Sequence, residues 1–173
     1  MKNRYNYKAT NEGLLLRTAI QSLKEKIDPL DENYKKYEYI IKAEVTSLEN
    51  INFDGYMLLL ADVVLVSREI SGFVSSFGSV QNSLTAYVLD IVDVFDYEGY
   101  KFRDFTPFVK DPVVNIVISS YANNGCIGYI KHKYPKLIKK TKKRTIIFND
   151  DLKIKFIDLG IDIRKKYDED EFQ

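Results

Sequence analysis

The feature that most constrains this chain is its densest apolar run, Tyr56–Val66 (YMLLLADVVLV). Drawn as a helix, this stretch is apolar on most sides, and a helix of that kind is buried on most sides. The run has eleven residues and contains Asp62, whereas a membrane span needs about 20 apolar residues. We therefore expect a core helix of a globular domain, which follows a turn at 50–55 and extends to about Phe77.

A second apolar element, Leu84–Phe95 (LTAYVLDIVDVF), follows a segment rich in Gly and Ser. Its apolar side chains recur at helical spacing, which predicts an amphipathic helix that is capped by Asn82 or Ser83 and ended by Gly99. The β-branched residues of both apolar elements also suit strands. The length of each apolar pattern favours a helix.

Three further helices are predicted from capping signals and apolar stripes. One covers about 10–27, and the next begins at the Asp28-Pro29 pair and runs to about 48. Alternation within 37–45 also fits a strand, but the capping signal favours the helix. The last begins at the Asp111-Pro112 pair and ends at the Asn-Asn-Gly sequence of 123–125.

The pattern changes after residue 125. Cys126–Tyr134 alternates weakly and predicts a strand, and Arg144–Phe148 with Leu152–Leu159 predicts a hairpin. The expected fold class is α+β, with a mainly helical N-terminal two-thirds of about five helices and a small antiparallel β-hairpin region at the C-terminus. We expect a single domain over 1–173, composed of an N-terminal arm (1–8), a helical body (9–125), a β-rich part (126–164) and an acidic tail (165–173).

Composition argues against most kinds of catalytic site. Hydrophobic residues make up 45% of the 173 residues and charged residues 29%, which is typical of a globular chain. The one cysteine, Cys126, and the one histidine, His132, cannot by themselves supply a zinc site. Six residues apart on a strand, they would lie about 20 Å apart, too far for a nucleophile and its base. With no P-loop and no GxGxxG motif, we expect no catalytic residue, no metal and no cofactor.

The most distinctive local feature is a run of basic residues at 131–144, which we call the basic segment. Such a run can neutralise phosphates, and the neighbouring Tyr129 and Tyr134 can stack bases. It can equally meet an acidic protein surface or remain a solvated loop. The candidate interaction residues of the basic segment are Lys131, His132, Lys133, Lys136, Lys139, Lys140, Lys142, Lys143 and Arg144.

A group of carboxylates, Asp90, Asp93, Asp96 and Glu98, lies on or just after the second apolar element. On a helix, adjacent pairs of these residues could share a cation, although a solvated acidic face explains them as well. On a neighbouring copy, this acidic group or the tail residues Asp168–Glu171 would offer a surface to the basic segment.

The net charge of +1 gives no global indication of a partner. Aromatic residues outside clear stripes suggest interfaces. We therefore expect a non-enzymatic structural protein in a multi-subunit assembly, such as a ring subunit of a phage head–tail connector or tail, in the host cytoplasm or a virion. Its partners would be copies of itself or other subunits, and no membrane. One alternative is a nucleic-acid-binding accessory protein that acts through 129–144, and a second is a small carboxylate-dependent enzyme or an inhibitor of one.

Overall fold

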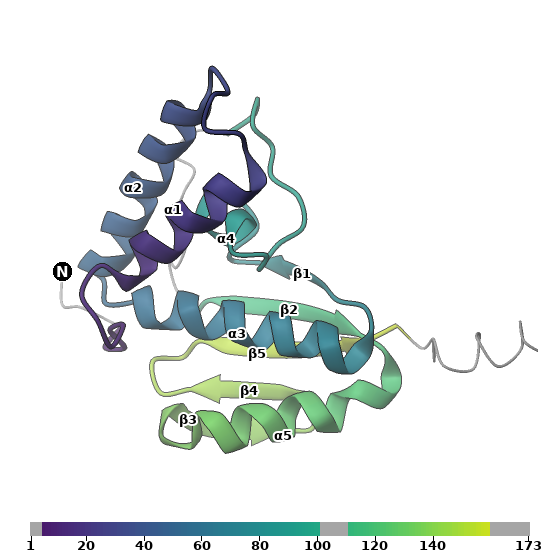
Figure 1. Ribbon diagram of the computed structural model, residues 1–173. Coiled ribbons are helices and arrows are strands. Elements are labelled where there is room, and N and C mark those ends of the chain that lie inside the picture. The colour runs from purple at the N-terminus through teal and green to yellow at the C-terminus, as the bar shows by residue number, and fades with distance from the viewer. Residues whose placement is uncertain (1–4, 101–110, 160–173) are drawn as a thin grey trace, which may run out of the picture. The chain divides into compact units, whose positions relative to one another are not determined.

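The computed structural model describes residues 5–100 and 111–159 (Figure 1). The described residues form five α-helices and one five-stranded sheet, so the predicted α+β class is confirmed. The helices are α1 (Leu14–Lys26), α2 (Tyr34–Asn50), α3 (Asp54–Ser71), α4 (Leu84–Val88) and α5 (Asn123–Lys133). The strands are β1 (Ser75–Gly78), β2 (Val113–Ile118), β3 (Ile138–Lys142), β4 (Thr145–Phe148) and β5 (Lys153–Asp158).

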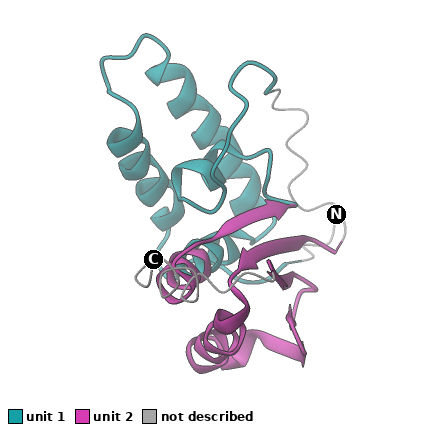
Figure 2. Ribbon diagram, turned by 90° about the vertical axis from the view of Figure 1, so that its right-hand side faces the viewer, with its two compact units in different colours: residues 1–62, 79–110 teal, residues 63–78, 111–173 magenta. Residues whose placement is uncertain are grey.

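The chain divides into two compact units, which Figure 2 distinguishes by colour. The first unit comprises 1–62 and 79–110, and the second comprises 63–78 and 111–173. Helix α3 contributes its first half to the first unit and its second half to the second. The single domain over 1–173 stays a prediction, and the acidic tail lies outside the described residues.

The first unit is helical. Its core is formed by the buried faces of α1, α2 and the first half of α3, including Leu15, Leu23, Ile41, Leu48 and Leu60, each fully buried. Residues 5–8 of the predicted N-terminal arm are tied to this core, because Tyr5 is only 2% exposed. The Tyr7 N–H donates to the carbonyl of Asn52 at 3.1 Å, and the Gly55 N–H donates to the carbonyl of Tyr7 at 3.1 Å.

Glu44 joins α2 to α4 inside the first unit. Its carboxylate is fully buried and accepts hydrogen bonds from the backbone N–H groups of Leu84 and Thr85 at 2.9 and 2.8 Å. The hydroxyls of Ser83 and Tyr100 donate to the same carboxylate, each at 2.9 Å. Four donors therefore offset part of the cost of burying this carboxylate.

Two helix boundaries in the first unit differ from the predictions. Helix α2 begins at Tyr34, because Asp28 and Asp31 accept hydrogen bonds from the N–H groups two residues on and form turns before the helix. Helix α4 is capped by Ser83 as predicted, but it ends at Val88 instead of continuing to about 98. The chain then turns at Asp90, whose φ of 58° is left-handed, so the acidic group does not lie on a helix.

The second unit is built on the sheet, with strand order β1-β2-β5-β4-β3. β2 and β5 are parallel, whereas all other neighbouring strands are antiparallel. Alternate residues of β2, β4 and β5 are buried beneath α5 and the second half of α3, which lie on one face of the sheet (Figure 1). No helix in the described part of this unit covers the other face, which we call the open face.

The small residues Ser67 and Ser71 of α3 lie inside the second unit. Both are buried, and Ser71 Oγ accepts a hydrogen bond from the Ser119 N–H at 2.8 Å. The hydroxyl of Tyr121 donates to the carbonyl of Ser71, also at 2.8 Å. The small side chains thus let the backbone after β2 approach the end of α3 closely.

The predicted helix over 111–125 and the predicted strand over 126–134 are wrong, because the two elements occur in the opposite order. Five of the six residues of β2 are β-branched, and β2 pairs with both β1 and β5. Helix α5 buries Cys126, Ile127 and Ile130 at helical spacing. The predicted hairpin is confirmed as β4 and β5, which are antiparallel.

Among the described residues, no single helix is long and apolar enough to cross a membrane. Helices α2 and α3 reach the required length and apolar content only as a pair, and the pair is bent by 112° at its break.

Candidate nucleic-acid interface

The basic segment is divided among several elements of the second unit. Lys131, His132 and Lys133 form the last turn of α5, and Lys136 lies in the short 3-10 helix η3 (Pro135–Leu137). The remaining cations lie on β3 and in the turn between β3 and β4, at 139–144. The basic segment is therefore continuous in sequence and spans α5, η3, β3 and the β3–β4 turn in the structure.

Three cations of the basic segment have partners within the second unit. Lys139 pairs with Asp151 at 3.1 Å, and Arg144 pairs with Asp158 at 3.2 Å. Lys133 donates to the hydroxyl of Tyr129 at 3.0 Å. These pairs are exposed or half-exposed and each contributes little stability, on the order of 0–1 kcal/mol.

The two tyrosines of this region already have a cation over them. Lys133 Nζ lies 5.5 Å from the ring centroid of Tyr129 and 5.6 Å from that of Tyr134. Cation–π contacts of this kind stabilise exposed sites by about 0.5–1 kcal/mol. The stacking role predicted for these tyrosines would require Lys133 to move.

The open face of the sheet brings four lysines together. Residues that pair across neighbouring strands point to the same face, so the register defines two rows that begin and end on lysine. Neighbouring strands lie about 4.8 Å apart, which places the lysines of one row about 10 Å apart. The two rows are Lys140–Ile147–Lys153 and Lys142–Thr145–Lys155.

None of these four lysines has a carboxylate partner within residues 5–100 and 111–159. Lys140, Lys142 and Lys155 are exposed, and Lys153 is half-buried. The strand residues of the open face include no Asp or Glu, because Asp158 belongs to the opposite face with the buried Phe156 and Ile154. The open face is therefore a cationic surface.

Lys153 and Lys155 are absent from the candidates predicted from the sequence. They follow the basic segment by nine or more residues and alternate with buried Ile154 and Phe156 on β5. This alternation was the sequence signal that could have identified them as site residues. A strand that presents lysine at every second position extends the basic face of the strand with which it pairs. The parallel pairing with β2 was not predictable from local sequence.

The acidic candidates lie in the first unit. Asp90 pairs with Lys26 at 2.6 Å, and Asp96 accepts a hydrogen bond from the Gly99 N–H at 2.8 Å. Asp93 and Glu98 are exposed. Within the described residues, no group of three or more His, Cys, Asp or Glu side chains is arranged to hold a metal ion. The alternative of a small carboxylate-dependent enzyme, or an inhibitor of one, was based on a helix through these carboxylates, and the structure has no helix there.

A cavity of about 450 Å³ in the first unit also collects carboxylates, from Glu12, Glu49 and Asp54, beside Lys8. Burial raises the pKa of Glu49, and the charges of Asp54 and Glu12 raise it further. Asp54 accepts a hydrogen bond from the Ala9 N–H at 3.0 Å and so helps to hold the arm.

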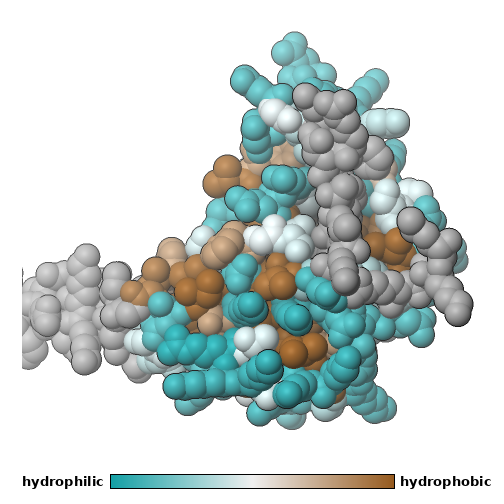
Figure 3. Space-filling model, turned by 180° about the vertical axis from the view of Figure 1, so that it is seen from behind, coloured by the Kyte–Doolittle hydropathy of each residue, from teal (hydrophilic) through white to brown (hydrophobic). Residues whose placement is uncertain are grey.

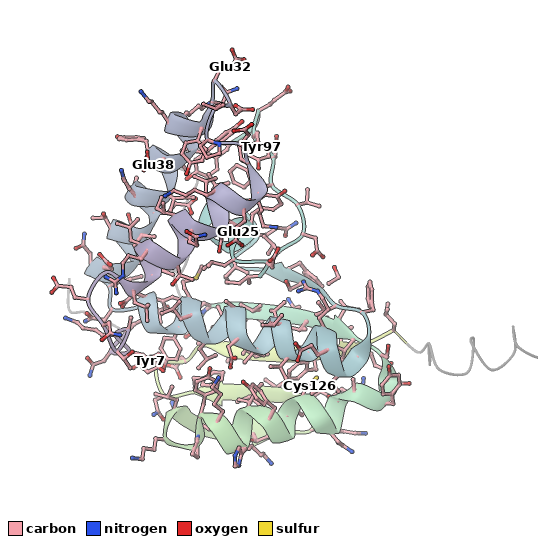
Figure 4. The ribbon with its side chains drawn as sticks, in the orientation of Figure 1. Tyr7, Glu25, Glu32, Glu38, Tyr97 and Cys126 are labelled. Atoms are coloured by element: carbon pink, nitrogen blue, oxygen red, sulfur yellow. The ribbon has the colours of Figure 1, made fainter. Side chains whose placement is uncertain are left out.

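Cys126 and His132 do not form a reactive pair. Both lie on α5 rather than on a strand, so the predicted separation of about 20 Å shortens to about 9 Å along the helix axis. Cys126, which is labelled in Figure 4, is buried, whereas His132 is exposed. Burial raises the pKa of the Cys126 thiol, which makes it a poor nucleophile.

The comparison with protein families decides what kind of protein this is. The sequence model of the bacterial DNA polymerase III alpha NTPase domain matches residues 13–149. The chain belongs to this family. The match begins beside α1, contains the whole basic segment and ends before β5. No curated protein matches the chain.

Membership of a DNA replication family overturns the expectation of a phage structural or assembly protein. Several of the aromatic residues that suggested interfaces have aromatic partners inside the first unit. Tyr97 lies 4.9 Å from the ring centroids of both Tyr37 and Phe95. Burial, together with the neighbouring Tyr87, raises the pKa of Tyr97 to about 12, and its place among the side chains is labelled in Figure 4.

Proposed function

We propose that this member of the DNA polymerase III alpha NTPase domain family contacts nucleic acid in DNA replication, through the basic segment. The observation that carries the proposal is the density of the segment, with eight Lys or Arg residues in fourteen positions of a chain whose net charge is only +1. The family match includes all of these positions. A cytoplasmic location, as expected from the sequence, suits this role.

The contacts proposed are with phosphates. Lysine is a compact point charge that suits sequence-independent phosphate binding, and seven of the eight cations are lysines. Each neutralised phosphate releases counterions, so binding would weaken steeply with salt. Lys140, Lys142 and Lys143 are the best placed of the exposed cations, because they project from β3 and the adjoining turn without a carboxylate partner in the described part of the chain.

The proposal concerns binding and does not extend to nucleotide hydrolysis. The sequence has no P-loop motif to hold a triphosphate. The described residues also offer no cluster of carboxylates suited to the metal ion that phosphoryl transfer uses.

The test is reversal of charge in the hairpin that β3 and β4 form, which is called the hairpin below. We expect the quadruple variant K139E/K140E/K142E/K143E to lose binding to a fluorescent single-stranded oligonucleotide by at least about 100-fold at low salt, because it replaces four attractive charges with four repulsive ones. Fluorescence anisotropy measures the affinity. We expect the variant to remain folded, because the four substituted side chains are exposed. Circular dichroism and thermal unfolding test this.

The matched control reverses four lysines that lie in the first unit, K24E/K35E/K36E/K42E, and so makes the same change in net charge. We expect this control to retain most of the affinity. Equal loss in both variants would mean that net charge alone governs binding, and unchanged binding in the hairpin variant would refute the proposed function.

A further inference from the structure

We propose that a single strand of nucleic acid lies across the open face of the sheet, with its phosphates on Lys140, Lys142, Lys153 and Lys155 and a base stacked on Phe77. This inference rests on the proposed function and specifies both the path and the class of nucleic acid. Two of its lysines, Lys153 and Lys155, lie outside the basic segment and beyond the end of the family match.

The first reason for this path is the charge of the open face. The register places the four lysines at the corners of a patch that spans β3, β4 and β5. Along a strand, residues two apart are separated by about 7 Å, which is in the range of neighbouring phosphates on an extended nucleotide chain. The positive charge of the patch is complementary to a row of phosphates. The β-strand residues on this face include no Asp or Glu that would repel them.

The second reason for this path is the exposed apolar side chains of the open face. The open face continues from the lysines to β2 and the edge strand β1, where the register sets Phe77 beside Asn115, and Asn115 beside Lys155. Phe77 is 41% exposed and Ile157 is 38% exposed, so the open face presents apolar side chains beside its lysines. Figure 3, viewed from behind, shows apolar side chains among hydrophilic ones over the lower part of the molecule.

The dimensions favour a single strand over a duplex. Five strands at about 4.8 Å spacing make the face about 19 Å wide, whereas the major groove is about 12 Å wide and admits a helix or a two-stranded ribbon. A single strand exposes its bases, and an aromatic side chain on a sheet can stack one of them. Phe77 lies at one end of the row Phe77–Asn115–Lys155–Thr145–Lys142, so this row offers a base contact on β1 and phosphate contacts on β5 and β3.

The first experiment reverses the two lysines that only this inference uses. We expect K153E/K155E to weaken binding of a single-stranded oligothymidylate by about 10-fold or more and to reduce the slope of log affinity against log salt by about 1.4, which is two phosphates at 0.7 each. The matched control, K35E/K36E, reverses two exposed lysines of α2 in the first unit, outside both the basic segment and the open face. We expect its loss to be clearly smaller, and equal losses would overturn the path across the open face.

The second experiment tests the base contact. We expect Phe77→Ala to weaken binding by about five-fold or more, and Phe77→Tyr to restore it, because stacking on an aromatic ring is lost and then regained. A fluorescent 2-aminopurine base in the oligonucleotide reports stacking directly, and its quenching should disappear with F77A. Phe73, which is 38% exposed and lies outside the strands, provides the control Phe73→Ala with no expected effect.

The outcomes separate this inference from the proposed function. If hairpin reversal abolishes binding while K153E/K155E and F77A bind like the parent chain, the proposed function stands and the path is wrong. If hairpin reversal has no effect, both fail. As an unlabelled competitor, duplex DNA should displace the oligonucleotide less well than single-stranded DNA or RNA does. Comparing single-stranded DNA with RNA identifies the preferred kind of strand. Equal competition by polyglutamate would assign the face to an acidic protein instead and overturn the inference.

Discussion

Glu44 is a buried charged residue of the first unit, and its one carboxylate binds both the start of α4 and the hydroxyl of Tyr100. Burial raises the pKa of Glu44 above its ordinary value of 4.5, and the hydrogen bonds from Thr85, Leu84 and Tyr100 offset only part of the shift. A carboxyl with a raised pKa in the folded state makes folding less favourable once it ionises. Its destabilising effect is absent below about pH 4.5 and is complete above the folded-state pKa.

We therefore predict that Glu44→Gln lowers the free energy of unfolding, by about 1–3 kcal/mol, because the amide group of Gln cannot accept all the hydrogen bonds of the carboxylate. The loss should be larger at pH 5 than at pH 8, since only the parent chain is weakened by ionisation at position 44 as the pH rises. Urea unfolding at both pH values measures the difference. A loss that is the same at pH 5 and pH 8 would contradict the raised pKa.

Gly55 provides a second test at the residue scale, because it lets the N-terminal arm approach α3. A Cβ at this position would lie 2.7 Å from both the Cδ1 atom and the carbonyl oxygen of Tyr7. We predict that Gly55→Ala destabilises the chain by about 1–3 kcal/mol through overpacking. It should also increase cleavage in the arm during limited proteolysis. An arm that resists protease as well as the parent arm does would show that the contact is dispensable.

At the scale of elements, the sequence predicted the α+β class, the core helix around Tyr56–Val66, the Ser83 cap and the C-terminal hairpin. Each depends on local pattern or capping, which a single sequence contains. It misplaced β2 and α5, because the run Val113–Ile118 is apolar enough for either state and its parallel partner, β5, lies far along the chain. It also missed Lys153 and Lys155 as site residues, since only the register joins them to β3 and β4.

Helix α5 allows a direct check of the corrected assignment. Gly128 lies within α5, is exposed, and has nothing within 4 Å of an added Cβ. Alanine is favoured over glycine in a helix by about 1 kcal/mol, so we predict that Gly128→Ala stabilises the chain by about 0.5–1 kcal/mol. Thermal unfolding measures the change. Destabilisation by this substitution would favour the strand originally expected over 126–134.

At the scale of the whole molecule, the positive and negative charges nearly cancel, but they are unevenly distributed along the chain. The net charge is +1, yet the second unit contains the basic segment and the lysines of the open face. Local fields, rather than net charge, therefore determine which partner the chain attracts. The family match adds the context of DNA replication to a surface that is suited to phosphates.

The most direct test of nucleic-acid binding is a salt titration of the parent chain with a fluorescent single-stranded oligonucleotide. Five lysines of this region, Lys140, Lys142, Lys143, Lys153 and Lys155, have no carboxylate partner among the described residues. If each neutralises one phosphate, log affinity should fall against log salt with a slope of about −3.5, at 0.7 per phosphate. A slope near this value would support binding through the lysines. A slope near zero, or no binding at low salt, would contradict the account.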